Sequence, residues 1–443
     1  MKANNAINKL EYDRNNDNRK NNGEVIGERF VFENRPCECK IDIIHNNGIQ
    51  QYRLQVKASS CDRIFYAYDS RKRGLVTTDS EYREVLDGSD VLTELCNLRW
   101  DIKKEPGPLA EYFRKYGFFI PISDQYYAIY DLEEILKVLT RLQRMIDLLY
   151  ELTCDSEKIN YNHLFELTFY YILSDENASI VRDNKGSMNL QIQSFLHPYS
   201  NIWWKPDFLK IREKLWPIFV NGEDIENLYE SYNPSEHYYV IYDSFIGKDV
   251  ELNRLNWIQY ITDEEPIEPY QNQGRADEIA WEIDFHYLTV SKENIELRKV
   301  VDFLYHFNTE VIMINRITPD GKVGFEREID LNNSQTFNNR YKELLMEIAK
   351  AVYKSELDWG LKRIRPVCNA ESFRPKWNIP SFLTALYFSL FYFDSEYQEY
   401  RICENETCRK WFSVPKSRRN KKYCSKECAN LAAQRRFRRK KIK

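Results

Sequence analysis

The sequence predicts a mixed α+β, multi-domain protein. It has a β-hairpin-containing N-terminal region, a largely helical and mixed body, and a C-terminal four-cysteine module with a basic helix. Its 443 residues, of which 43% are hydrophobic, are enough for two or three cores. Apolar residues recur with the two-residue period of strands in some segments and with a helical period in others. Residues 401–443 combine four closely spaced cysteines with a strongly basic composition.

We predict four segments along the chain. Residues 1–26 form a disordered leader, because they are polar, rich in Asn, and lack the apolar core of a signal peptide. A β-rich and mixed region follows over residues 27–130, and a mixed α/β body over residues 131–400. Within the body, residues 262–278 have the Pro, Gly and charge content of a linker. Residues 401–443 form the cysteine module.

The clearest β-hairpin has the sequence CKIDIIHNNGIQQYRLQVKA, which begins at Cys39. Asn47 and Gly48 form a dipeptide that favours a two-residue turn between antiparallel strands. Apolar residues alternate on the return strand at Tyr52, Leu54 and Val56. A second hairpin is predicted around the turn at residues 319–321.

A helix is predicted from Asp131, where Glu134 completes a capping-box spacing. Its apolar residues recur every seven positions, which favours packing on the chain's own core; a dimer seam, and so a homodimer, is the alternative. Further helices are predicted over residues 335–356 and from Ser381 onward. The stripe of the first helix consists of Ile135, Leu142 and Leu149, with Val138, Met145 and Leu152 beside them.

Composition excludes several classes of function. With only 14 glycines, the chain shows no Gly-rich phosphate-binding fingerprint, which argues against Rossmann-type and P-loop enzymes. The longest apolar run, residues 382–393, is shorter than the ~20 residues that cross a bilayer, so we expect no membrane association. Six of the ten cysteines are scattered over the first 368 residues; with no signal peptide, we expect reduced thiols and a cytoplasmic location.

The best candidate for a catalytic centre lies in residues 281–288, which alternate as a strand would. Glu282, Asp284 and His286 would then share one face, where they could bind a divalent metal or exchange protons. The same pattern is typical of the solvent-facing side of an amphipathic strand. No nucleophile–base pair is evident elsewhere, so we assign no catalytic residue, and a binding protein is favoured over an enzyme.

Four cysteines near the C-terminus form two close pairs, Cys403 with Cys408 and Cys424 with Cys428, separated by fifteen residues. Two such pairs can place four sulfurs in the tetrahedron that structural zinc prefers. Disulfides are not expected in a cytosolic chain. We therefore predict a structural Zn²⁺ site. Because the module has few apolar residues, we expect its folding to depend on the metal.

The residues around the cysteines predict how the module is built. Ser425 is placed to cap a helix that contains Cys428, and the run ANLAAQ after it favours the helical conformation. Trp411 and Phe412, between the pairs, could cover the thiolates.

The module is basic, whereas the rest of the chain is acidic. Residues 401–443 contain 16 Lys and Arg against three Glu, a formal charge of +13, so the other 400 residues carry −17. Basic side chains fixed beside a structured element attract phosphate and make affinity dependent on salt. We predict nucleic-acid contacts, with duplex DNA favoured, for Arg418, Arg419, Lys422, Arg435, Arg436, Arg438 and Arg439.

These residues resemble the CGNR-type zinc finger proteins, a bacterial family assigned to transcription regulation. The shared features are the two cysteine pairs, an aromatic and basic segment between them, Ser425, Asn430, and the run RRFR from Arg435. Ala429 and Leu431 stand where the signature has Gly and Arg. The resemblance covers residues ~400–443. It implies a DNA-binding finger behind a sensory or stress-response domain.

Together these features predict a zinc-dependent nucleic-acid-binding protein, a DNA-binding transcriptional regulator with an N-terminal sensor or oligomerisation body. One alternative is a nucleic-acid-processing enzyme or defence effector that holds its substrate with the finger. A second alternative is an RNA- or ribosome-binding protein, because the sequence of a basic zinc module does not show whether it binds DNA or RNA. A third is a purely structural tail that docks on the acidic body.

Overall fold

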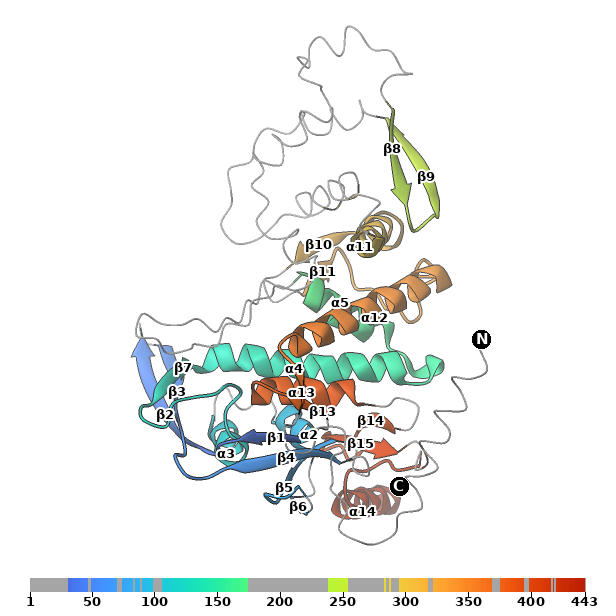
Figure 1. Cartoon of the computed structure of the whole chain (residues 1–443). Helices are drawn as coiled ribbons and strands as arrows, with labels where there is room; N and C mark the ends of the chain where they lie inside the picture. The colour runs from blue at the N-terminus through green and yellow to red at the C-terminus, as the bar shows by residue number, and fades with distance from the viewer. Residues whose placement is uncertain are drawn as a thin grey trace, which may run out of the picture. The chain divides into compact units, whose positions relative to one another are not determined.

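The structure is a computed structural model (Figure 1). It describes residues 31–46, 49–69, 74–82, 84–87, 90–98, 106–173, 238–253, 283, 287, 295–317, 322–368, 375–393, 398–415, 417 and 420–442. Contacts divide the chain into two units, the first formed by residues 1–132 and 360–443 and the second by residues 133–359. The predicted leader and the predicted linker lie outside the described residues. The predicted domain boundaries stay a prediction.

Two antiparallel sheets occupy the N-terminal part of the first unit (Figure 1). One has the order β1 (Val31–Asn34), β4 (Ile64–Asp69), β5 (Gly74–Thr78) and β6 (Val85–Asp87). The other has the order β2 (Cys37–Asn46), β3 (Ile49–Ala58) and β7 (Ala128–Asp131).

The structure confirms the predicted hairpin in strands β2 and β3. Asn46 is paired with Ile49, and residues 47 and 48 between them lie outside the described part. Leu54 and Val56 of β3 are fully buried. The two-residue alternation therefore points one face of β3 into the core.

The first unit also contains four helices among its described residues: α2 (Val91–Cys96), α3 (Gly107–Tyr116), α13 (Phe382–Phe391) and α14 (Lys426–Ile442). The predicted start of α13 is confirmed, because the Ser381 hydroxyl accepts a hydrogen bond from the Thr384 N–H at 3.2 Å. Two short strand pairs complete the unit, β12 (Arg365–Cys368) with β13 (Pro375–Asn378) and β14 (Gln398–Ile402) with β15 (Trp411–Pro415).

The described part of the second unit is mainly helical, with α4 (Leu132–Thr153), α5 (Tyr161–Leu173), α11 (Ile295–His306) and α12 (Asn339–Leu361). A 3₁₀ turn at Ser156–Lys158 separates α4 from α5, and a π-helical turn at Phe307–Val311 follows α11. Its hairpins are β8 (Tyr238–Asp243) with β9 (Lys248–Asn253) and β10 (Ile314–Ile317) with β11 (Val323–Phe325). The hairpin predicted near residue 320 is thus confirmed, although its turn lies outside the described residues.

The apolar stripe of α4 is buried within the chain. Ile135, Leu142 and Met145 are fully buried, and Leu149 is nearly so. This confirms core packing for the stripe. A homodimer stays an untested alternative.

The strand predicted at residues 281–288 is wrong at its described positions. Ile283 and Tyr287 are helical and buried, one helical turn apart. Glu282, Asp284 and His286 lie outside the described part of the chain, so their shared face stays a prediction.

Among the described helices, none combines the length and the apolar composition of a membrane span.

A buried ion pair joins two helices of the second unit. Arg141 of α4 donates two hydrogen bonds to the Glu356 carboxylate of α12, at 2.6 and 2.5 Å, and both side chains are almost completely buried. The bidentate geometry satisfies both charges away from water.

A polar network surrounds His306 at the end of α11. Its Nε2 lies 2.7 Å from Asp243 Oδ2, and its Nδ1 lies 2.8 Å from Glu310 Oε1. Asp243 also accepts a hydrogen bond from Tyr287, and Glu310 accepts one from Tyr341. Both ring nitrogens face carboxylate oxygens, an arrangement that favours a proton on each nitrogen and so the positively charged imidazole. Burial lowers the pKa of His306, but the hydrogen bonds to Asp243 and Glu310 outweigh it and raise the pKa above its usual value.

This network predicts a pH dependence of stability. Because the pKa of His306 is higher in the folded state, protonation of His306 stabilises the fold. This stabilisation is fully present below the unfolded pKa of about 6.5. That stability is lost as the pH rises through the folded pKa. We expect the difference in unfolding free energy between wild type and His306→Gln, from urea denaturation, to be largest below about pH 6.5 and to shrink at higher pH. The exposed His45→Gln variant is the control. A difference that does not vary with pH would contradict the assignment.

Candidate metal centre

The sulfur atoms of Cys403, Cys408, Cys424 and Cys428 converge on one point. All four Sγ atoms lie within 4.8 Å of one another. The Cys408–Cys424 and Cys424–Cys428 sulfurs are both separated by 3.6 Å. Four sulfurs at about 2.3 Å from a tetrahedral zinc ion are about 3.8 Å apart, whereas a disulfide needs about 2.05 Å. The four thiols are therefore arranged to bind one metal ion, and the spacing fits zinc.

The first cysteine pair is positioned by a tight turn after β14. The Cys403 N–H donates to the Lys410 carbonyl at 2.9 Å, and the Cys408 N–H donates to the Asn405 carbonyl at 2.8 Å. Arg409 adopts a left-handed conformation with φ of 49°, which turns the chain back into β15. The hairpin β14–β15 thus brings both sulfurs to the same side.

The second pair lies at the start of α14. The Ser425 hydroxyl accepts a hydrogen bond from the Cys428 N–H at 3.2 Å, which confirms the predicted N-cap. Residues four positions apart share one face of a helix at its first turn. The cap therefore fixes Cys428 beside Cys424.

A small apolar cluster covers one side of the sulfurs. Cys403 and Val414 are fully buried and Phe412 is 8% exposed, while Tyr423 and the other three cysteines pack against them. Phe412 covers the centre as predicted. Excluding water from the thiolates strengthens their interaction with a cation.

The backbone of Trp411 makes two hydrogen bonds outside the module. Its N–H donates to the Asn97 side-chain oxygen at 2.7 Å, and its carbonyl accepts from the Asn97 amide at 2.8 Å. Asn97 is the C-cap residue of α2. This pair of hydrogen bonds attaches β15, and with it the cysteine centre, to the N-terminal part of the first unit.

Arg435 holds α14 against the turn between the first two cysteines. Its two terminal nitrogens donate to the Asn405 side-chain oxygen and to the Thr407 hydroxyl, both at 2.9 Å. Asn405 is 98% buried. Cys428, Ala429, Ala432 and Arg435 lie on one side of the helix and are less exposed than the other residues from Lys426 to Arg438. The helix is therefore fixed at two points, by a cysteine ligand and by an arginine two turns later.

Hydrogen bonding and burial affect the thiols differently. A hydrogen bond from the Asn405 side chain is the main cause that lowers the pKa of Cys428 to about 7. Burial is the main cause that raises the pKa of Cys408 and Cys424 above the usual value. Because a metal binds thiolates, metal binding must displace protons from Cys408 and Cys424 at neutral pH.

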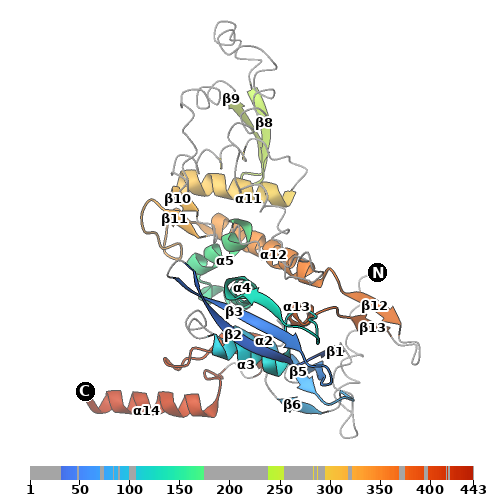
Figure 2. The same cartoon turned by 90° about the vertical axis from the view of Figure 1, so that its left-hand side faces the viewer.

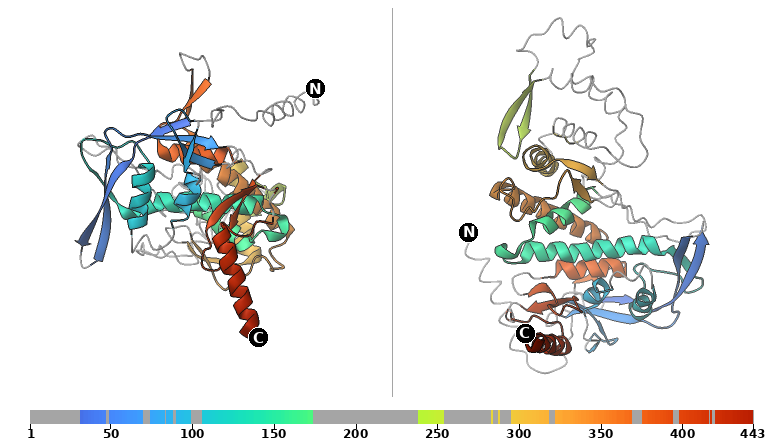
Figure 3. Two further views of the ribbon diagram at one scale, coloured as in Figure 1. Left: turned by 90° about the horizontal axis from the view of Figure 1, so that it is seen from below. Right: turned by 180° about the vertical axis from the view of Figure 1, so that it is seen from behind.

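The predicted phosphate contacts fall into three groups. Arg436 and Arg438 are exposed on α14, which leads away from the sheets of its unit (Figures 2 and 3). Lys422 is exposed and forms an ion pair with Glu404 at 3.3 Å, and Arg435 is held in the turn. Arg418 and Arg419, and the side chain of Arg439, lie outside the described part of the chain.

Sequence reasoning missed two residues that build this centre. The local sequence could have indicated Asn405, because Asn between two close cysteines is typical of a tight turn. No local pattern could have indicated Asn97, because it is 314 residues from Trp411.

Comparison of the chain with protein-family models, with curated proteins and with solved structures finds no match. The resemblance of residues 400–443 to CGNR-type fingers therefore stays a prediction.

The geometry predicts that the metal stabilises α14. In Cys424→Ala, or after chelation of the wild type, we expect α14 to lose its attachment and its amides to lose protection from hydrogen exchange, measured by mass spectrometry. The control is Cys61→Ala, because Cys61 is an exposed free thiol far from the centre in sequence. Unchanged protection of α14 after removal of the metal would contradict this role.

Proposed function

We propose that the chain is a zinc-dependent DNA-binding protein, and that α14 is the helix that enters the duplex. The observation that supports this most directly is that α14 is attached to the module along one side. One stripe is held by Cys428 and Arg435, and the opposite side is exposed. A helix fixed on one side and free on the other is how many DNA-binding domains present a recognition helix.

The outward side of α14 has amide side chains. At about 100° per residue, Asn430 and Gln434 lie about 200° and 240° around the axis from Cys428. Both are exposed. The amides of Asn and Gln can donate to and accept from the major-groove edge of adenine. The side of the helix away from the metal is thus suited to contact bases.

Arginines lie on both flanks of this surface. By the same geometry, Arg436 and Arg438 lie about 80° and 280° from Cys428. α14 has 17 residues, about 25 Å in length, and the major groove is about 12 Å wide. A helix lying there would bring its two flanks toward the two phosphate backbones.

The remaining predicted phosphate contacts are supported to different degrees. Lys422 pairs with Glu404 in an exposed ion pair, which is worth little in water and leaves Lys422 able to turn to a phosphate. Arg435 is the weakest candidate, because two of its N–H groups already bind the turn. Arg418, Arg419 and Arg439 stay proposed contacts on the basis of charge alone.

The resemblance to CGNR-type fingers supports a transcriptional regulator, with the rest of the chain as a sensor or oligomerisation body. The metal proposed at the four cysteines is zinc, because four thiolates in a tetrahedron are its usual structural site. RNA or ribosome binding and a nucleic-acid-processing enzyme are outcomes that the experiments below can distinguish.

The flanking arginines predict the salt dependence of DNA binding. We expect duplex DNA to bind more tightly than matched RNA in fluorescence anisotropy of zinc-loaded protein. Arg436→Ala with Arg438→Ala should lower the slope of log affinity against log salt by about 2. The control removes two exposed charges elsewhere, by Arg327→Ala with Lys354→Ala. An unchanged slope would remove these arginines from the interface, and tighter RNA binding would favour the RNA alternative.

The amide side chains predict sequence preference. After selection of a preferred duplex from a random pool, Asn430→Ala with Gln434→Ala should bind that duplex about 10- to 100-fold more weakly. Binding to random DNA and the salt slope should not change. Gln125→Ala, at an exposed position outside the module, is the control. A variant that keeps the wild-type base preference would exclude these residues from base contact.

A further inference from the structure

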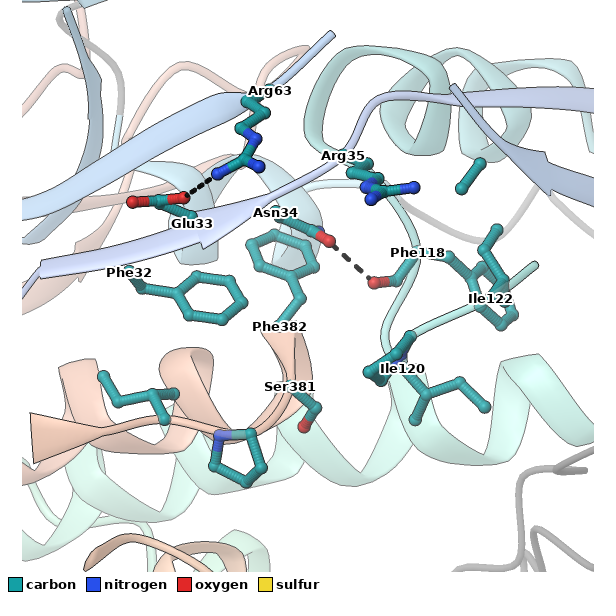
Figure 4. A pocket seen from close by; sticks show the side chains of 14 residues that line it. Phe32, Glu33, Asn34, Arg35, Arg63, Phe118, Ile120, Ile122, Ser381 and Phe382 are labelled. Carbon is teal, nitrogen blue, oxygen red and sulfur yellow. Dashed lines mark hydrogen bonds and ion pairs between the residues drawn. The ribbon is translucent and has the colours of Figure 1, made fainter. Parts of the chain in front are cut away.

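The first unit contains a pocket of about 500 Å³, shown in Figure 4. Its walls come from β1, from residues 118–122 after α3, and from residues 379–382 at the start of α13. Small-molecule sites in proteins span about 300–1,000 Å³, so the pocket is large enough for a ligand. It involves neither the cysteine centre nor α14.

The floor of the pocket is apolar and ordered. Phe32, Phe118 and Phe382 line it and are almost completely buried. The rings of Phe32 and Phe382 are stacked, with centroids 6.4 Å apart and planes 11° from parallel. Phe382 is the first residue of α13, whose N-cap is Ser381. This floor is therefore preformed and does not need to be organised by a ligand.

The rim of the pocket is charged. Arg35, Arg63 and Glu33 line it and are exposed. Glu33 is already satisfied, because one oxygen accepts from Arg63 Nη1 at 2.9 Å and the other from the Tyr82 hydroxyl at 3.1 Å.

The two arginines keep donors for a ligand. Arg35 pairs through Nη1 with Asp124 at 2.8 Å, and Arg63 pairs through Nη1 with Glu33. A guanidinium has five N–H donors in a planar fork, so each ion pair uses only part of the group. Both pairs are exposed and can therefore be exchanged for an anion at little cost.

We propose that this pocket binds a small amphipathic anion, with an apolar or aromatic body against Phe32 and Phe382 and an acidic head group between Arg35 and Arg63. A buried apolar floor with charges confined to the rim selects this orientation, because burying the charged end first would leave it without water or a partner. The inference goes beyond DNA binding and does not rest on it.

Anilinonaphthalene sulfonate is a suitable probe, because it combines an aromatic body with one anionic group and becomes fluorescent in apolar surroundings. We expect the intact, zinc-loaded chain to bind one molecule per chain. Arg35→Ala with Arg63→Ala should weaken binding about tenfold or more, because charged hydrogen bonds are lost. The neutral parent, anilinonaphthalene, should bind wild type and variant equally.

A matched control is Arg53→Ala. Arg53 and Arg35 have the same side-chain exposure of 44%, and each forms one ion pair with an aspartate, but Arg53 does not line the pocket. Sulfonate binding should not change in this variant. Equal weakening by Arg53→Ala, no weakening in the double variant, or no binding of either probe to wild type would each overturn the proposal.

Discussion

The convergence of four sulfur atoms on one point is the constraint on which the C-terminal module depends. The sulfurs come from the end of a strand, a tight turn, the segment before a helix and the helix's first turn, and they lie within 4.8 Å of one another. Few apolar residues surround them. Contacts between thiols at this distance stabilise the module little. Thiolates around one divalent cation stabilise it more, because their charges are neutralised and their geometry is fixed. The direction of α14 is set by the sulfur cluster and by the contacts of Arg435 with the turn.

The module is also attached to the rest of its unit by hydrogen bonds to its backbone. The Asn97 side chain binds the backbone N–H and C=O of Trp411, much as a neighbouring strand residue would. A helix that projects from a free finger could turn in any direction, but a helix on an anchored hairpin has a defined one. The proposed DNA surface, the outward side with Asn430 and Gln434, therefore has a defined orientation relative to the first unit.

The elements that could be predicted from the sequence depend on local spacing. The close cysteine pairs, the Ser425 cap, the start of α13 and the β2–β3 hairpin each need only a few neighbouring residues. The contacts that could not be predicted join distant parts of the chain, as Arg141 and Glu356 do across 215 residues. The strand predicted at residues 281–288 is wrong at Ile283 and Tyr287, which are helical, because residues four apart share a face in a strand and in a helix, so the pattern did not distinguish the two. The contacts of Arg435 with Asn405 and Thr407 could not be predicted either, because charge alone does not show which arginines bind within the protein; its phosphate contact stays a prediction.

We propose that one metal ion, held by all four cysteines, fixes α14. X-ray absorption spectroscopy at the zinc edge of the purified full-length protein tests it most directly. We expect one zinc per chain and a single shell of four sulfurs at about 2.3 Å. A shell with nitrogen or oxygen in place of sulfur, or protein that folds fully without any bound metal, would contradict it.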